Sequence, residues 1–194
     1  MDPNLQIWKK LAGSLFDKLA ESAEHCLTHI SDPDRDVRIA AIGMCSLTWE
    51  RSDKEFISAC CQIAVTDPDH SVRTHAIGAI GRALRATRNE DVSHFLADLV
   101  KHEKIEGVCL EAYWALREIQ LGLNEEDVVR RVACMSKSMW RDVDIRDAIS
   151  NHFGLPVGND PPFKRDFLGG YPETVWDSSE QIDWEFVNRF ASKG

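Results

Sequence analysis

The apolar residues of this chain recur three and four positions apart, which is the spacing of one helix face. Two stretches show the pattern clearly, and in each the apolar positions fall on a single side of a helix. The members are Val37, Ala41, Met44 and Cys45 in one stretch, and Val72, Ala76, Ala79, Ile80 and Ala83 in the other. The alternation typical of a half-buried strand does not recur between residues 14 and 153, so the pattern predicts an all-α protein.

The same pattern repeats at a fixed distance along the chain. Residues 32–43 and 67–78 share eight of twelve amino acids, and the offset is 67 − 32 = 35. A weaker third copy occupies 103–116 with an offset of 36, and it has a cysteine where the second copy has an arginine. A fourth, at 142–153, is one residue shorter inside the motif. Repeats of this length predict supersecondary units that stack into a continuous core.

Each repeat reads as two helices joined by a short turn. Pro33 and Pro68 cannot continue a preceding helix, and Asp34 and Asp69 or the residues just after them can cap the following one. The helix pairs are expected at 14–50, 53–87, 89–122 and 125–153. Residues 3–13 are expected to form an additional turn or helix that covers the first pair.

These residues resemble the HEAT-repeat superfamily, and the phycobilisome-lyase-like HEAT repeats in particular. The signature Asp-Pro-Asp-x-x-Val-Arg-x-x-Ala-x-x-x-Leu-Gly is matched at 32–43 and 67–81, whereas the copies near 103 and 142 depart from it. The resemblance covers residues 14–153. It implies a right-handed α-α superhelix, a solenoid of about four helix pairs. It also implies structural contacts between successive units for four residues: Asp32, Arg38, Asp67 and Arg73.

The composition changes after residue 154, which divides the chain into a repeat domain, 1–154, and a C-terminal segment, 155–194. The segment contains four of the seven prolines, which argues against a further repeat. Residues 178–191 read as a final amphipathic helix with a serine cap, because Ile182, Phe186 and Phe190 are four apart. The segment is expected to pack back on the end of the solenoid; the alternative is that it lies in the concave groove.

Charge and cysteine content limit the classes of function. A net charge of −9 and a pI near 5.2 oppose general attraction to nucleic acid or anionic lipid. The six cysteines form no CxxC pair and mostly fall in apolar patterns, which indicates free thiols in a reducing compartment. The start of the chain lacks the pattern of a signal peptide, and no run of apolar residues is long enough to span a membrane. The protein is therefore expected in the cytoplasm.

Few residues indicate catalysis or metal binding. His25 and His29 are one helical turn apart, but no third ligand lies near them in sequence. His102-Glu103 is similar to the His-Glu dyads of HEAT-like di-iron hydroxylases, which need several such dyads, and this chain has one. Nucleophile-elbow and phosphate-loop glycine motifs are absent from the sequence. We expect no catalytic residues, no metal and no cofactor.

The strongest functional candidates are on the second helix of each pair, which is expected to line the concave side. Opposite the core positions are the expected partner-binding residues: Ile39, Trp49, Arg82, Arg85, Leu110, Trp114 and Arg117. Tryptophan and arginine are enriched at interaction hot spots. The alternative is that the tryptophans pack between units and the arginines are solvated.

The resulting hypothesis is a non-enzymatic scaffold or adaptor that binds a protein partner. A second hypothesis is a DNA-binding protein or a HEAT-like DNA glycosylase, with Arg73, Arg82, Arg85, Arg88, Arg117 and Trp114 on a basic face. A chromophore lyase is suggested only by the kind of repeat.

Overall fold

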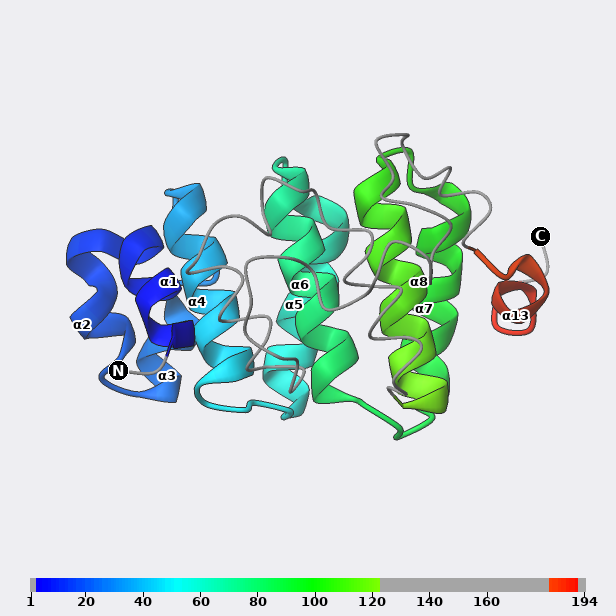
Figure 1. The fold of residues 1–194 in the computed structure, drawn as a ribbon, viewed down its shortest axis with the longest axis horizontal. Coiled ribbons are helices and arrows are strands. Elements are labelled where there is room, and N and C mark those ends of the chain that lie inside the picture. The colour runs from blue at the N-terminus through cyan, green and yellow to red at the C-terminus, as the bar shows by residue number, and fades with distance from the viewer. Residues whose placement is uncertain (1–2, 123–181, 192–194) are drawn as a thin grey trace, which may run out of the picture.

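The computed structural model describes residues 3–122 and 182–191, and both ranges contain helices and no strand (Figure 1). The helices of the first range are α1 (Pro3–Ala12), the 3-10 helix η1 (Gly13–Leu15), α2 (Phe16–Leu19), α3 (Ala23–Thr28), α4 (Arg35–Leu47), α5 (Lys54–Thr66), α6 (His70–Ala83), α7 (Glu90–His102) and α8 (Glu106–Leu121). The second range contains α13 (Trp184–Asn188). The all-α prediction is confirmed for these residues. The expected helix pair at 125–153 lies outside them.

The helices are arranged as a row of pairs. Helix α3 packs on α4, α5 on α6 and α7 on α8, while α4 contacts α6 and α6 contacts α8 (Figure 1). We call α4, α6 and α8 the second-helix row. Because each pair contacts mainly its neighbours in this row, the described part of the chain is an α solenoid rather than a closed bundle.

The side chains at the helix starts explain where the helices begin. Asp34, Asp53, Asp69 and Asn89 are extended in backbone conformation, and each side chain accepts a hydrogen bond from an exposed amide of the following helix. For example, Asn89 accepts from the amide of Val92 at 3.0 Å. Such capping bonds satisfy amides that have no partner within the helix. The predicted caps after both Asp-Pro-Asp turns are confirmed.

The core runs without a break from one pair to the next. Helices α4 and α6 are each sandwiched between neighbours, and Ile42, Met44, Ile77 and Ile80 are fully buried. Small residues permit the close approach of α6 and α8, since a Cβ added at Gly81 would lie 3.0 Å from the Cα of Ala115. A single pair could not bury these surfaces, so the stack is the stable unit.

Both ends of the row carry an additional helix. Helix α1 contacts α4, and the ring of Trp8 lies against Gly43; the predicted helix at 3–13 is thus present. At the other end α13 contacts α7, and the ring of Phe186 meets that of Tyr113 edge-on at 6.5 Å. The expected start of this last helix with a serine cap is corrected: Asp183 is the cap, accepting from the amide of Phe186 at 3.0 Å.

The division of the chain at residue 154 stays a prediction, because the boundary and residues 155–181 lie outside the described residues.

Candidate partner-binding surface

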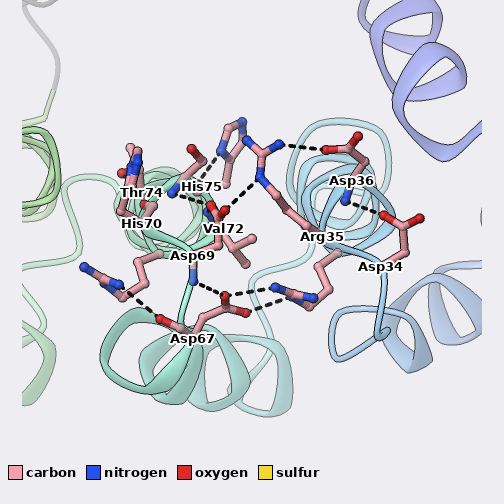
Figure 2. Close-up of polar contacts among 12 residues, drawn as sticks. Asp34, Arg35, Asp36, Asp67, Asp69, His70, Val72, Thr74 and His75 are labelled. Carbon is pink, nitrogen blue, oxygen red and sulfur yellow. Dashed lines mark hydrogen bonds and ion pairs between the residues drawn. The ribbon is translucent and has the colours of Figure 1, made fainter.

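Arginine and carboxylate side chains connect successive units along the turns. The Arg38 guanidinium donates to both oxygens of Asp67, from Nε at 2.8 Å and from Nη2 at 3.0 Å. One unit further, Arg73 donates to Glu103 at 3.3 Å and to the backbone oxygen of Asp67 at 3.1 Å. Figure 2 shows the neighbouring exposed pair, Arg35 and Asp69, 2.9 Å apart. The first two contacts form a ladder that holds the units in register.

Two residues differ from the sequence-based expectation for this ladder. The Asp32 carboxylate does not meet an arginine side chain; it accepts from the Asp34 amide at 2.9 Å and contacts His29 at 3.1 Å. These contacts, the Asp34 amide first, lower the pKa of Asp32. Glu103 was missed, although its position is given by the repeat, 67 + 36 = 103. In the third unit, Cys109 occupies the position that Arg38 and Arg73 have in the first two units.

The structure places two of the expected binding residues inside the protein. Ile39 and Trp114 are each 4% exposed, which corrects their expected presentation to a partner. Trp49 is half-buried and packs against the core. The indole N–H groups of Trp49 and Trp114 have no hydrogen-bond partner among the described residues. The burial of the two tryptophans agrees with the alternative interpretation, in which they pack between units.

Arg82 of α6 and Arg85, which follows the end of that helix, contact the neighbouring helices of the second-helix row in opposite directions. Arg82 donates from Nε to the Ser46 hydroxyl of α4 at 2.9 Å. Arg85 donates to one oxygen of Glu118 on α8, from Nε at 2.8 Å and from Nη2 at 2.7 Å. Glu118 is fully buried while the Arg85 side chain is 43% exposed. One edge of Arg85 is therefore anchored to the protein interior.

A mixed apolar and basic stripe runs along α8. Leu110 and Arg117 are half-buried, and the Arg117 guanidinium lies 5.8 Å from the ring centroid of Tyr113, 5.9 Å from that of Trp114 and 5.7 Å from that of Phe186. Leu121 is 57% exposed and was missed as a candidate. The sequence could have indicated Leu121 by its spacing, since positions 110, 114, 117 and 121 lie on one helix face. We call Leu110, Arg117 and Leu121 the α8 stripe.

A pocket of about 350 Å³ opens where α4 and α6 end. Its lining contains three arginines, two serines and one carboxylate; the residues are Ser46, Leu47, Glu50, Arg51, Ser52, Arg82, Ala83 and Arg85. Sequence reasoning found two of these arginines but missed Arg51, which comes from the connection between α4 and α5. The pocket is formed by two segments that are far apart in sequence, so no local motif predicts it.

A carboxylate outside the pocket anchors Arg51. Its Nε donates to Asp53 at 2.7 Å, and its Nη1 donates to the backbone oxygen of Ala23 at 3.2 Å. The hydrogen bond from Arg51 is the main reason that the pKa of Asp53 falls to about 2. Neither Asp53 nor Glu118 lines the pocket. Both carboxylates thus fix a guanidinium group from outside the lining.

The backbone around the pocket has two residues in the left-handed region. Glu50 has φ +46° and Ala86 has φ +57°, a region that glycine usually occupies. In the turn after α4, the Arg51 amide donates to the backbone oxygen of Cys45 at 2.9 Å. In the turn after α6, the Ala86 amide donates to the backbone oxygen of Glu118 at 2.9 Å. A local hydrogen bond therefore stabilises the first turn, and a tertiary hydrogen bond to α8 stabilises the second, in a conformation that these side chains disfavour.

The histidines and cysteines that could bind a metal or react chemically contact other protein groups or are buried. The rings of His25 and His29 are 5.1 Å apart, and His102 contacts the backbone oxygen of Asp98. Within residues 3–122 and 182–191, no group of three or more histidine, cysteine or carboxylate side chains is arranged for a metal ion. Burial raises the pKa of the Cys60 and Cys61 thiols, the latter to about 11, so both stay protonated at neutral pH.

Comparison with known proteins agrees with this architecture. Residues 23–117 match the family model of HEAT repeats, which identifies this part of the chain as a HEAT-repeat array. HEAT repeats are generally scaffolds for protein interaction. Searches of curated proteins and of solved structures returned no match. Among the described helices, none has the length and apolar character needed to cross a bilayer.

Proposed function

We propose that this protein is a non-enzymatic cytoplasmic scaffold or adaptor that binds a protein partner through the second-helix row. The observation that carries the proposal is the α8 stripe, where Leu121 exposes 57% of its surface in line with Leu110 and Arg117. Exposed apolar residues beside an arginine are typical of protein contact surfaces. The stripe continues toward α6 through the contact between Arg85 and Glu118.

The rigidity of the array supports the same function. Arg38 and Asp67 are largely buried, with side chains 12% and 7% exposed, and they join the first unit to the second. Arg73 and Glu103 join the second to the third. A surface assembled from several helices binds with less loss of entropy when the helices keep fixed relative positions. The ladder therefore serves binding indirectly, by holding α6 and α8 in register.

The electrostatics of the arginines argue against a nucleic-acid partner. Two of the arginines expected on a basic face are engaged by carboxylates, Arg73 by Glu103 and Arg85 by Glu118. The whole chain carries a net charge of −9. A surface whose cations are neutralised within the protein releases few counterions from DNA. No contact among the described residues favours a chromophore lyase over a binding protein.

Photo-crosslinking from the surface itself tests the proposal. A photo-reactive amino acid is placed at Leu110 or at Leu121 and irradiated in cells of the native organism. Both positions are expected to capture the same protein, and Arg117→Ala is expected to reduce the capture. The matched control is Val65 on α5, which is 56% exposed but lies on the other helix of its pair. Equal capture from Val65, or different proteins from the two α8 positions, would contradict the assigned surface.

A binding series with duplex and single-stranded DNA tests the alternative. We expect weak binding at low salt that disappears at physiological salt. Tight binding with a steep dependence on salt would instead support the nucleic-acid hypothesis, because affinity based on phosphate contacts falls strongly with salt concentration.

A further inference from the structure

The pocket between α4 and α6 combines a lining rich in arginine with donors that are held in place. The lining side chains include three arginines and one carboxylate, while Asp53 and Glu118 pair with Arg51 and Arg85 from outside the lining. Guanidinium groups donate in a planar fork that matches the oxygens of carboxylates and phosphates. The donor type therefore favours an oxyanion.

The arginines are oriented before any ligand arrives. Arg51 is fixed by Asp53 and by the backbone oxygen of Ala23, and Arg85 is fixed by Glu118. Arg82 is positioned by its bond to the Ser46 hydroxyl, which itself lines the pocket. Because these contacts use Nε of each arginine, a ligand does not have to order three long side chains. Such preorganisation distinguishes the pocket from a patch of mobile surface arginines.

The size and surroundings of the pocket point to a residue of a protein rather than to a free ion. A volume of about 350 Å³ accommodates a whole side chain with its oxyanion. Through Arg85 and Glu118 the pocket adjoins the last turns of α8, where Leu121 is exposed. Glu50 is exposed and lines the same pocket, which penalises a ligand with several adjacent negative charges. A nucleic-acid backbone has such charges, whereas a single acidic residue beside apolar ones does not.

We propose that this pocket binds the oxyanion of an acidic or phosphorylated residue in the partner, while adjoining apolar residues of the partner cover the α8 stripe. The inference rests on the proposed function and adds the chemistry of the partner segment. Arg51, Arg82 and Arg85 can donate in the same way to the oxygens of a carboxylate or of a phosphate. The experiment below distinguishes an acidic residue from a phosphorylated one.

The test follows the side-chain Nε–H signals of Arg51, Arg82 and Arg85 by NMR in the full-length chain. The probes are an acetylated tetrapeptide with one glutamate among apolar residues, its glutamine counterpart, its phosphoserine counterpart and a short single-stranded oligonucleotide. We expect saturable shifts with the glutamate peptide, with the phosphoserine peptide or with both, which identifies the source, and none with the glutamine peptide. Absence of shifts with both anionic peptides, or tighter binding of the oligonucleotide, would overturn the proposal.

Substitutions at exposed lining positions test the site without disturbing the fold. Ser52→Glu is expected to weaken binding of the anionic peptide, and Glu50→Gln to strengthen it, each by roughly two- to fivefold, as for exposed charge pairs. The matched control is Glu55→Gln, an exposed acidic residue that does not line the pocket. Equal effects of Glu50→Gln and Glu55→Gln would show long-range attraction and no site.

The outcome is separable from that of the proposed function. If Leu121 still captures its partner while the anionic peptides leave all three arginines unchanged, the pocket is not the recognition site and the scaffold proposal stands. If the peptides bind and no protein is captured from α8, the scaffold proposal fails.

Discussion

The ring of Trp8 occupies the space that a side chain at position 43 would require. A Cβ built on Gly43 overlaps the ring atoms of Trp8, so the two residues fit only because position 43 is a glycine. This contact seats α1 against α4 and closes the first end of the solenoid. It also covers a helix face that the repeat pattern alone would leave open.

Gly43→Ala is therefore expected to displace α1. The added methyl group forces Trp8 from its site, and the core loses the burial of an indole, at a cost of about 1–3 kcal/mol. Hydrogen exchange of residues 3–12 and the fluorescence of Trp8 report the displacement. Gly107→Ala is the control, because a Cβ at that helical position meets nothing within 4 Å. Unchanged exchange in α1 would show that Trp8 does not secure it.

The ladder between Arg38 and Asp67 is expected to contribute more stability than the exposed pair beside it. Arg38→Ala leaves a largely buried carboxylate without its partner and is expected to lower the free energy of unfolding by about 3 kcal/mol. Arg35→Ala removes a contact whose side chains are 50% and 30% exposed and is expected to cost less than about 1 kcal/mol. Urea unfolding of both variants compares them. Equal losses would mean that the ladder is not a specific link between units.

Acid stability is expected to depend on Asp53. Its folded pKa is lowered from 3.8 to about 2, so its contribution is present above about pH 4 and is lost as the pH falls toward 2. Asp53→Asn keeps a capping side chain for α5 but removes the charge. The variant is expected to be less stable than the wild type at neutral pH and equally stable near pH 2. Thermal unfolding across this range measures the difference, and a constant difference would exclude titration of Asp53 as its cause.

Replacing Ala86 by glycine is expected to stabilise the protein. At φ +57° an alanine pays a steric cost that glycine avoids, and the net gain is on the order of 0.5–1 kcal/mol. Ala59→Gly, inside α5, is the control and should cost about 1 kcal/mol, because glycine weakens a regular helix. Chemical denaturation distinguishes the opposite signs. Destabilisation by Ala86→Gly would mean that the turn is not strained at this residue.

The sequence alone was sufficient for the helices from α4 to α8 and for much of the ladder. Apolar spacing and the Asp-Pro-Asp turns are local signals, so the starts of α4 and α6 could be predicted from a few neighbouring residues. The offset of about 35 also brought Arg38 and Asp67 into consideration through the family resemblance. Glu103 was missed because the motif was read by residue identity, although a glutamate there supplies the same carboxylate.

Only the tertiary structure decided which faces of the helices are open. Ile39 and Trp114 have the sequence positions of surface residues, yet each is 4% exposed because other parts of the protein cover them. The pocket likewise depends on side chains from α4, α6 and their connections, which approach one another only when the units stack. Periodicity reports which side of a helix is apolar, and it contains no information on which neighbour covers that side. The repeat thus determined the solenoid, while packing between units determined which side chains stay exposed.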